Sequence, residues 1–424
     1  MQLHHSNLSL PLLLLSLTIT AVSALGSGRI YAQTTDQPAN DDPFSACLAR
    51  IEKQAIERNI KPQTIAQVFG GIEQLERVIA SDRKQAEFTT SFRDYYTRSV
   101  STTRVEKGRD RYNTMATQLS RITQSSGVPG HYLMAFWGLE TNFGGYMGNL
   151  SVPSALATLA CDARRAEFFT EQLLATLQIV EAGHMQPEQM VGSWAGAMGH
   201  MQFMPTTFME YAQNADADPA INVYESTADA LASAGHYLSQ IGWKKGERWG
   251  REARLPASFP YEQTGLNNWQ PLSYWADLGV TNAFGQPLPR LQIPAAVLLP
   301  AGRLGPAFVV YENFKIIMQW NRSIFYALSV GRLADRIAGA GRLAATLPQT
   351  RFSKNAIKSM QESLTQLGYN TRGADGIIGT ATRTALQQFQ LDQSLPADGF
   401  PDETTLEKLQ ALAAAKPQQH TEAG

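Results

Sequence analysis

The chain has 424 residues, a length that corresponds to two or three domains of ordinary size. A hydrophobic fraction of 43% and 7 Trp residues provide for a sizeable core. The formal net charge of -1 excludes a strong overall field toward nucleic acid or anionic lipid. The sequence also has no long Lys/Arg run and no glycine-rich phosphate loop, so it gives no support to nucleic-acid or nucleotide binding.

The N-terminal segment predicts export. Residues 8–21 are apolar but too short for a comfortable membrane span, and small residues follow, with possible cleavage after Ala24 or Ala32. We therefore predict a signal peptide over residues 1–32 and a periplasmic mature protein. The segment before the apolar run has no Lys or Arg, which leaves an uncleaved membrane anchor as the alternative. Membrane contact is expected only in that case.

The two cysteines, Cys47 and Cys161, fit an exported protein. A single pair in such a chain can form one disulfide, which would tie the N-terminal helical segment to the region after Glu140. The alternative is two independent buried thiols. Neither cysteine has neighbours of the kind that bind a metal.

Apolar periodicity predicts a mainly helical body, of class α or α+β, over residues 43–338. Residues 43–119 and 128–237 follow helical patterns, with loops at 144–145 and 194–204. Residues 244–312 are rich in Pro and Gly and predict short strands and loops inserted in the helical domain, with one strand at 308–311. One helix is expected over 314–336, and a linker over 339–352.

The C-terminal unit, residues 353–412, contains an internal repeat, since Asp375-Gly376 recurs as Asp398-Gly399. Each Asp-Gly turn precedes a helix start with threonines, at positions 380, 382, 404 and 405, and Thr is a favourable N-cap. A small three-helix domain without a ligand is the simplest interpretation. Residues 413–424 are predicted to be a disordered tail. The expected core residues are Leu364, Leu367, Leu386, Phe389, Leu406 and Leu409.

Glu140 is the strongest catalytic candidate. It lies near the end of a helix predicted over residues 129–141, which Pro129 begins and a Gly-Gly pair ends. Burial against an apolar face would raise the pKa of its carboxyl group, as a general acid requires. The alternative is a glutamate at the edge of the core, paired with an Arg. Three apolar residues share its helix face at helical spacing: Leu133, Phe136 and Trp137.

One polar loop has the spacing of a calcium site. Asn214, Asp216, Asp218 and Glu225 stand at positions 1, 3, 5 and 12 of an EF-hand-like pattern. Asn at position 1 and Pro219 in place of the usual Gly depart from that pattern. We expect no required cofactor and no metal ligand, with a polar loop of Asx turns as the main interpretation and a structural Ca²⁺ left open.

The middle of the chain resembles the lytic murein transglycosylases of the B type, which cleave peptidoglycan. The sequence GLETNFG around Glu140 looks like the catalytic motif of that family, and GSWAGAMGHMQFMP, residues 192–205, is the strongest match. The resemblance covers residues 43–337 and implies a lysozyme-like helical domain with Glu140 as the catalytic residue. It implies substrate-binding roles for Ser193, Gln202, Tyr237, Asn321 and Tyr326.

These assigned roles have structural alternatives. Tyr237 and Tyr326 would serve equally as core aromatics, and Ser193 as a helix N-cap. Tyr326 or Asn321 would be placed to orient Glu140.

The C-terminal unit is similar to peptidoglycan-binding domains of the first type. The matching positions include Gln361, Asp375-Gly376 and Asp398-Gly399. The two resemblances together imply that the glycan strands of peptidoglycan are the partner of the protein. We expect a monomer.

The chemistry implied is cleavage of the β-1,4 bond between N-acetylmuramic acid and N-acetylglucosamine. No second carboxylate stands in a comparably specific motif, which favours a single catalytic Glu that forms 1,6-anhydromuramic ends. Two alternatives stay open: a hydrolytic muramidase of related fold, and a non-enzymatic protein that binds the cell wall.

Overall fold

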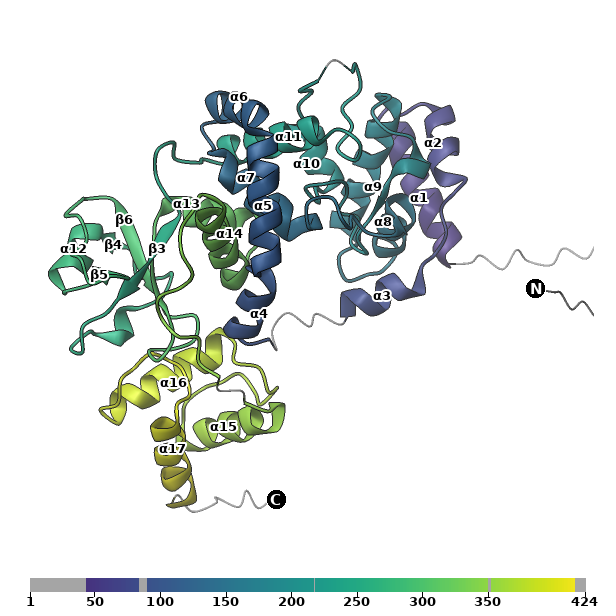
Figure 1. The fold of residues 1–424 in the computed structure, drawn as a ribbon. Helices are drawn as coiled ribbons and strands as arrows, with labels where there is room; N and C mark the ends of the chain where they lie inside the picture. The colour runs from purple at the N-terminus through teal and green to yellow at the C-terminus, as the bar shows by residue number, and fades with distance from the viewer. Residues whose placement is uncertain (1–42, 84–89, 217, 350–351, 416–424) are drawn as a thin grey trace, which may run out of the picture. The chain divides into compact units, whose positions relative to one another are not determined.

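The computed structural model describes residues 43–83, 90–216, 218–349 and 352–415 (Figure 1). The predicted signal peptide lies outside this part of the chain. None of the helices in the described ranges is long and apolar enough to cross a membrane.

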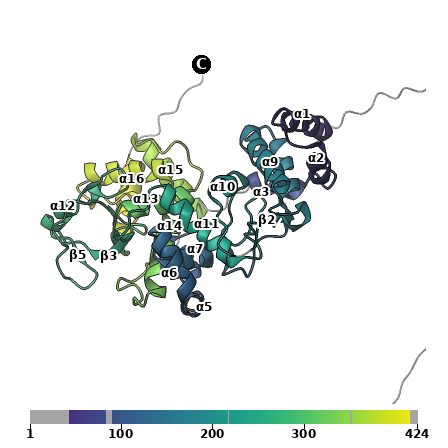
Figure 2. The same cartoon turned by 90° about the horizontal axis from the view of Figure 1, so that it is seen from above.

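The first half of the described chain is helical, as predicted. Serine side chains cap four of its helices; for example, Ser91 accepts a hydrogen bond from the Asp94 N–H and Ser101 from the Arg104 N–H. In the two ribbon views α1 and α2 lie beside α9 (Figures 1 and 2). The helices are α1 (Pro43–Glu57), α2 (Pro62–Phe69), α3 (Glu76–Arg83), α4 (Phe92–Ser99), α5 (Thr102–Thr114), α6 (Ala116–Ser126), α7 (Gly130–Thr141), α8 (Val152–Ala160), α9 (Ala166–Glu181), α10 (Pro205–Tyr211) and α11 (Thr227–Gln240).

The central helix of this domain is α7, which carries Glu140. It begins one residue after Pro129 and ends where Asn142 adopts a left-handed conformation with φ 51°. It packs against α5, α6, α11 and α14. Residues 132–138 are all buried, so the apolar surface of α7 extends beyond the face that Leu133, Phe136 and Trp137 share with Glu140. A helix in contact with neighbours on every side is apolar all round.

The region between α11 and the next long helices forms an antiparallel sheet, which confirms the predicted insertion of strands and loops. The strand order is β4-β6-β7-β3-β5, and Val297 of β6 pairs with Val309 of β7. A separate pair, β1 (Leu150–Ser151) and β2 (Val191–Gly192), joins segments near Glu140. The five strands are β3 (Gly250–Arg254), β4 (Gln270–Pro271), β5 (Thr281–Asn282), β6 (Pro294–Leu298) and β7 (Ala307–Val310), with α12 (Leu272–Asp277) between β4 and β5.

The single helix expected over residues 314–336 is instead two helices, α13 (Glu312–Trp320) and α14 (Ile324–Ile337). Asn321 and Ser323 cause the break. The Asn321 side chain accepts from the Ser323 N–H at 3.1 Å, and the Ser323 hydroxyl accepts from the Tyr326 N–H at 3.3 Å. Short polar side chains compete in this way with helical hydrogen bonds and begin a new helix.

The C-terminal module consists of α15 (Lys354–Leu367), α16 (Thr380–Asp392) and α17 (Glu403–Ala415), as predicted. Leu364, Leu386, Phe389 and Leu409 form its core, with Leu367 and Leu406 at the edge. The threonines are not the helix caps. Gly379 precedes α16 without a side-chain cap, and Asp402 caps α17. Residues 413–415 belong to α17, and the rest of the predicted tail lies outside the described ranges.

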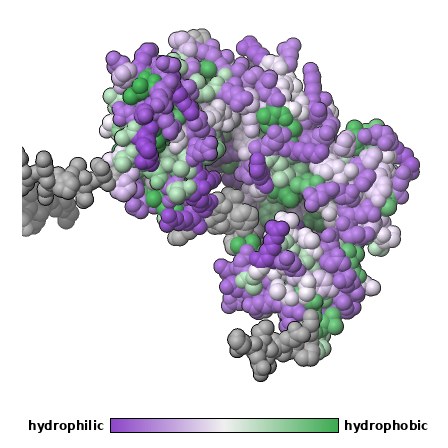
Figure 3. Space-filling view, turned by 180° about the vertical axis from the view of Figure 1, so that it is seen from behind, coloured by the Kyte–Doolittle hydropathy of each residue, from purple (hydrophilic) through white to green (hydrophobic). Residues whose placement is uncertain are grey.

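Cys47 of α1 and Cys161 after α8 form a disulfide with an S–S distance of 2.02 Å. It closes a sequence separation of 114 residues and joins the N-terminal helix to the helical core. On the face of the molecule shown in Figure 3, hydrophilic residues cover most of the surface and hydrophobic residues form separate patches.

Candidate active site

A cavity of about 360 Å³ opens beside the end of α7, and Glu140 lines it. We call it the Glu140 cavity. Its walls come from α3, from the segment 146–150 and from the segment 192–202. Glu140 is the sole carboxyl group among the described residues that line it. The side chains of Ser193 and Gln202 also line this cavity.

Two neutral donors hold the Glu140 carboxyl group. The Trp320 indole Nε1–H donates to Oε1 at 2.9 Å, and the Tyr326 hydroxyl donates to the same oxygen. Neither Lys nor Arg forms an ion pair with Glu140 within the described ranges, so the predicted alternative of an Arg partner does not hold there. Because both donors reach Oε1, Oε2 is the oxygen left for a substrate.

Burial raises the pKa of Glu140 to about 7, although the hydrogen bonds from Tyr326 and Trp320 oppose the shift. Burial also raises the pKa of Tyr326 well above its ordinary value, so its hydroxyl remains a donor. Glu140 therefore exchanges its proton near neutral pH, as a residue that acts first as acid and then as base requires.

The break between α13 and α14 brings the side chains of Trp320 and Tyr326 to the Glu140 carboxyl group. Trp320 is the last residue of α13 and Tyr326 lies in the first turn of α14, and both side chains converge on α7. Trp320 was missed as a site residue, although it directly precedes Asn321. Its ring packs on Phe136 at a centroid distance of 4.5 Å and on Tyr237 at 5.4 Å. Tyr237 therefore supports Trp320 from the side.

Ser193 and Gln202 share the Glu140 cavity, as predicted for neighbours of the catalytic residue. The Ser193 oxygen accepts from the backbone N–H groups of Ala195 and Ala197, so it holds a turn and is not a helix N-cap. Among the described residues its hydroxyl donates to no acceptor. The Gln202 amide donates to the carbonyl oxygens of Met147 and Gly199 at 3.1 and 3.0 Å. These bonds hold the Gln202 side chain in one orientation.

His200 attaches the motif at 192–205 to α7. Its Nδ1 accepts from the Trp137 indole at 3.1 Å, and its carbonyl oxygen accepts from the Thr141 hydroxyl at 2.8 Å. Burial lowers the pKa of His200, which favours this neutral acceptor form. A Cβ at Gly144 would lie 2.5 Å from the His200 ring, so glycine is required for this close approach. No local sequence pattern predicts this anchor, because its hydrogen bonds join residues 63 and 59 positions apart.

Asn321 lies outside the Glu140 cavity. Its side chain accepts from Ser323 and lines a second, larger cavity together with Arg322 and Phe325. Asn321 is therefore not in a position to orient Glu140. It influences the site only indirectly, because it helps to break the helix between Trp320 and Tyr326.

Asp162, a second carboxyl group near Glu140 in sequence, has a basic partner away from the Glu140 cavity. Asp162 pairs with Arg83 at 3.3 Å. The neighbouring arginines contact Asp82, with N–O distances of 3.3 Å for Arg164 and 2.5 Å for Arg165.

Polar side chains of the loop with EF-hand-like spacing form hydrogen bonds with neighbouring groups. The Asn214 side chain donates to the Asp218 carbonyl oxygen, and the Asp216 carboxylate accepts from Ser226 and from the Asp218 N–H. Glu225 accepts from a neighbouring asparagine. Among the residues that the structure describes, no group of three or more His, Cys, Asp or Glu side chains is arranged to hold a metal ion. Its acidic side chains instead stabilise turns, which agrees with the Asx-turn interpretation.

The raised pKa of Glu140 predicts a dependence of stability on pH. The carboxyl group ionises near pH 4.5 in the unfolded chain and near 7 in the fold, so the free energy of unfolding falls as the pH rises between these values. Glu140→Gln removes this penalty. We expect the variant to be about 3 kcal/mol more stable than wild type at pH 8 and equally stable at pH 4. Urea unfolding at both pH values measures the difference, and equal stabilities at pH 8 would contradict the raised pKa.

A largely helical domain with one buried carboxyl group of raised pKa, facing a cavity with fixed hydroxyl and amide groups, defines the lysozyme-like class of enzymes that cleave glycosidic bonds. A family model described as a transglycosylase SLT domain matches residues 43–335, and the chain belongs to that family. A second model, a putative peptidoglycan binding domain, matches residues 353–409.

Similar proteins support this classification. Membrane-bound lytic murein transglycosylase B of Escherichia coli (strain K12) is 28% identical over 298 residues, covering 68% of this chain and 81% of that protein. SltB3 from Pseudomonas aeruginosa, solved with NAG-NAM-pentapeptide, is 39% identical with a TM-score of 0.81, covering 86% of this chain and 99% of that one. The Escherichia coli lytic transglycosylase Slt35, solved with calcium, is 28% identical with a TM-score of 0.60, covering 71% and 94%.

Proposed function

We propose that the protein is a lytic transglycosylase that cleaves the β-1,4 bond between N-acetylmuramic acid and N-acetylglucosamine in peptidoglycan. The observation that carries this proposal is the isolated Glu140 carboxyl group, with a pKa of about 7 and one oxygen directed to a cavity. Two-carboxylate glycosidases divide the roles of acid and base between two groups. Here one group performs both.

The reaction begins with protonated Glu140. Its proton passes to the leaving oxygen of N-acetylglucosamine as the glycosidic bond breaks, and the 2-acetamido oxygen of the muramic residue bonds to the anomeric carbon. The Glu140 carboxylate then takes the proton of the C6 hydroxyl, and that oxygen displaces the acetamido oxygen. The product is a 1,6-anhydromuramic end, no water is consumed, and Glu140 is protonated again.

The walls of the site position these steps. We assign Ser193 and Gln202 to hydrogen bonds with the N-acetyl group or the adjacent glycan, since their side chains line the cavity in fixed orientations. Tyr326 and Trp320 hold Glu140 and stabilise its ionised form between the two steps. Tyr237 packs on Trp320 and so supports one of the two side chains that hold Glu140.

The Tyr326 hydroxyl lowers the pKa of Glu140, so its removal should raise that pKa further. We expect Tyr326→Phe to move the alkaline limb of the pH–rate profile to higher pH, because Glu140 then stays protonated up to a higher pH. The maximal rate should fall about tenfold through lost orientation. The control is Tyr112→Phe on α5, which should leave the profile in place. An alkaline limb that does not move in Tyr326→Phe would contradict the assigned contact.

We further propose that the C-terminal module binds peptidoglycan and raises the local concentration of the catalytic domain at the wall. An enzyme with this substrate acts outside the cytoplasm. We place it in the periplasm, exported by residues 1–32, as a monomer that requires no cofactor.

Digestion of purified sacculi tests the proposed function against a purely wall-binding role. The purified protein should sediment with sacculi and release soluble muropeptides in a time-dependent way. Sedimentation without release would establish the non-enzymatic alternative. A hydrolytic muramidase would also release fragments, and the chemistry of the new ends distinguishes it from a transglycosylase.

A further inference from the structure

The C-terminal module contains the same polar network twice. In the first copy, the Gln361 amide donates to Asp375 Oδ1 at 2.9 Å and to Thr382 Oγ1 at 3.0 Å. It also donates to the Ile377 carbonyl oxygen, and the Gly376 N–H donates back to Gln361 Oε1 at 2.8 Å. One buried glutamine thus closes the turn onto the start of α16.

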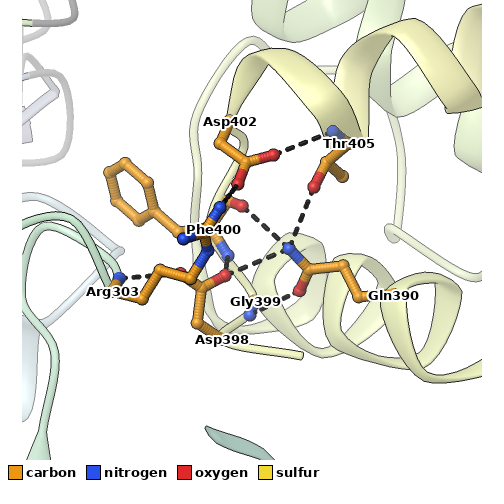
Figure 4. A network of polar contacts seen from close by, with 7 residues as sticks. All are labelled: Arg303, Gln390, Asp398, Gly399, Phe400, Asp402 and Thr405. Atoms are coloured by element: carbon orange, nitrogen blue, oxygen red, sulfur yellow. Dashed lines mark hydrogen bonds and ion pairs between the residues drawn. The ribbon is translucent and has the colours of Figure 1, made fainter. Parts of the chain in front are cut away.

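The second copy repeats each of these contacts (Figure 4). The Gln390 amide donates to Asp398 Oδ1 at 3.0 Å, to the Phe400 carbonyl oxygen at 3.0 Å and to Thr405 Oγ1 at 3.3 Å. The Gly399 N–H donates to Gln390 Oε1 at 2.8 Å. We call residues 375–379 the first turn and residues 398–402 the second turn.

The second turn has a partner in the transglycosylase domain. The loop between β6 and β7 presents Arg303, whose backbone N–H donates to Asp398 Oδ2 at 2.7 Å (Figure 4). The Arg303 guanidinium contacts Asp402 Oδ2 at 2.7 Å. The two side chains are only 27% and 17% exposed, so solvent screens this ion pair less than a surface pair. The contacts join residues 95 and 99 positions apart in sequence.

Shape and hydrogen bonding fit this contact as well. Gly302 has φ 72°, and a Cβ added to it would lie 2.8 Å from the Cβ and Cγ atoms of Phe400. Asp402 binds two groups. Its Oδ1 accepts a hydrogen bond from the Thr405 N–H at the start of α17, and its Oδ2 contacts the Arg303 guanidinium. The loop therefore contacts a rigid helix start.

The first turn lacks the features that hold the loop. Gly379 stands where the second turn has Asp402, so the first turn has no second carboxylate for an arginine. Within the described residues, no hydrogen bond joins the first turn to the transglycosylase domain. The two copies share an internal structure and differ in what they contact.

We propose that the second turn is a docking site for the transglycosylase domain, with the loop at residues 301–304 as its ligand and Arg303 as the central contact. The module is then held to the transglycosylase domain both by the linker and by the contacts of Arg303 with the second turn. A module held in this way presents the catalytic domain to the wall in one orientation. The second turn thus attaches the module to the transglycosylase domain. The first turn takes no part in that contact.

Amide hydrogen exchange of the full chain, followed by NMR, tests the dock without reference to activity. Asp402→Asn removes the charge and keeps an N-cap acceptor, so it should undock Arg303 without unfolding α17. We expect exchange of the Arg303 N–H to rise at least about tenfold, the loss expected when a hydrogen-bonded charge loses its partner. The Gly376 and Gly399 amides should stay protected, because their partners lie within the module.

Two further variants sharpen this test. Gly302→Ala, which forces a clash with Phe400 and leaves every charge in place, should expose the Arg303 amide in the same way. Asp375→Asn, the matched change in the first turn, should leave Arg303 protected. Unchanged protection of Arg303 in both Asp402→Asn and Gly302→Ala would overturn the proposal. Loss of protection at Gly399 together with Arg303 in both would also overturn it, because the module would then be unfolding and not undocking.

Discussion

Glu140→Gln is expected to lower the rate of glycan cleavage at least about a thousandfold, the upper part of the range for a lost general acid–base group. The amide cannot give a proton to the leaving oxygen and cannot take one from the C6 hydroxyl, so both steps fail. The fold should persist, because glutamine is isosteric and its amide oxygen still accepts from Trp320 and Tyr326. Release of soluble muropeptides from sacculi measures the rate.

The control for this variant is Glu167→Gln, which neutralises an exposed glutamate at the start of α9. Its rate should stay within about twofold of wild type, as is usual for surface substitutions away from the site. Circular dichroism of both variants should match wild type. Cleavage by Glu140→Gln at the wild-type rate would refute the assignment of Glu140.

Loss of the Cys47–Cys161 disulfide should have the largest effect on stability. A cross-link that closes a loop of 114 residues restricts the unfolded chain, and the loop-entropy relation gives about 4 to 5 kcal/mol for that length. We expect the variant in which both cysteines are replaced by alanine to lose about 4 kcal/mol of unfolding free energy. The lost constraint joins α1 to the segment after α8.

Urea unfolding of the double variant and of reduced wild type measures this effect. Since the chain has only 2 Cys residues, reduction affects this bond alone, and the two samples should agree. Under native conditions the double variant should still cleave glycan, because neither cysteine lines the Glu140 cavity. A loss below about 1 kcal/mol would show that the cross-link does not constrain the unfolded chain as expected.

Helix content, the inserted strands and the three-helix module were predictable from sequence because each rests on local pattern. The predicted place of Glu140 near a helix end and its neighbourhood with Ser193 and Gln202 agree with the structure. The resemblance, and not periodicity, supplied that neighbourhood, since residues 140 and 193 are brought together only by the tertiary fold. The predicted family and the transglycosylase activity are supported by the relatives.

Features that depend on long-range packing could not be predicted. The periodicity around Glu140 identified the face that it shares with Leu133, Phe136 and Trp137, but not the burial of the other faces of α7. The break at Asn321 and Ser323 depends on side chains that hydrogen-bond the backbone, and its consequence, the placement of Trp320 against Glu140, spans 180 residues. The dock of Arg303 on the second turn is equally non-local.

The chemical nature of the new glycan ends tests the central claim most directly. Sacculi are digested in water enriched in ¹⁸O, and the muropeptides are analysed by mass spectrometry for wild type and Glu140→Gln. A single catalytic Glu that closes the C6 hydroxyl onto the anomeric carbon predicts 1,6-anhydro ends without ¹⁸O from wild type, and no new ends from the variant. Reducing ends that carry ¹⁸O would show that water is the nucleophile and would contradict the account.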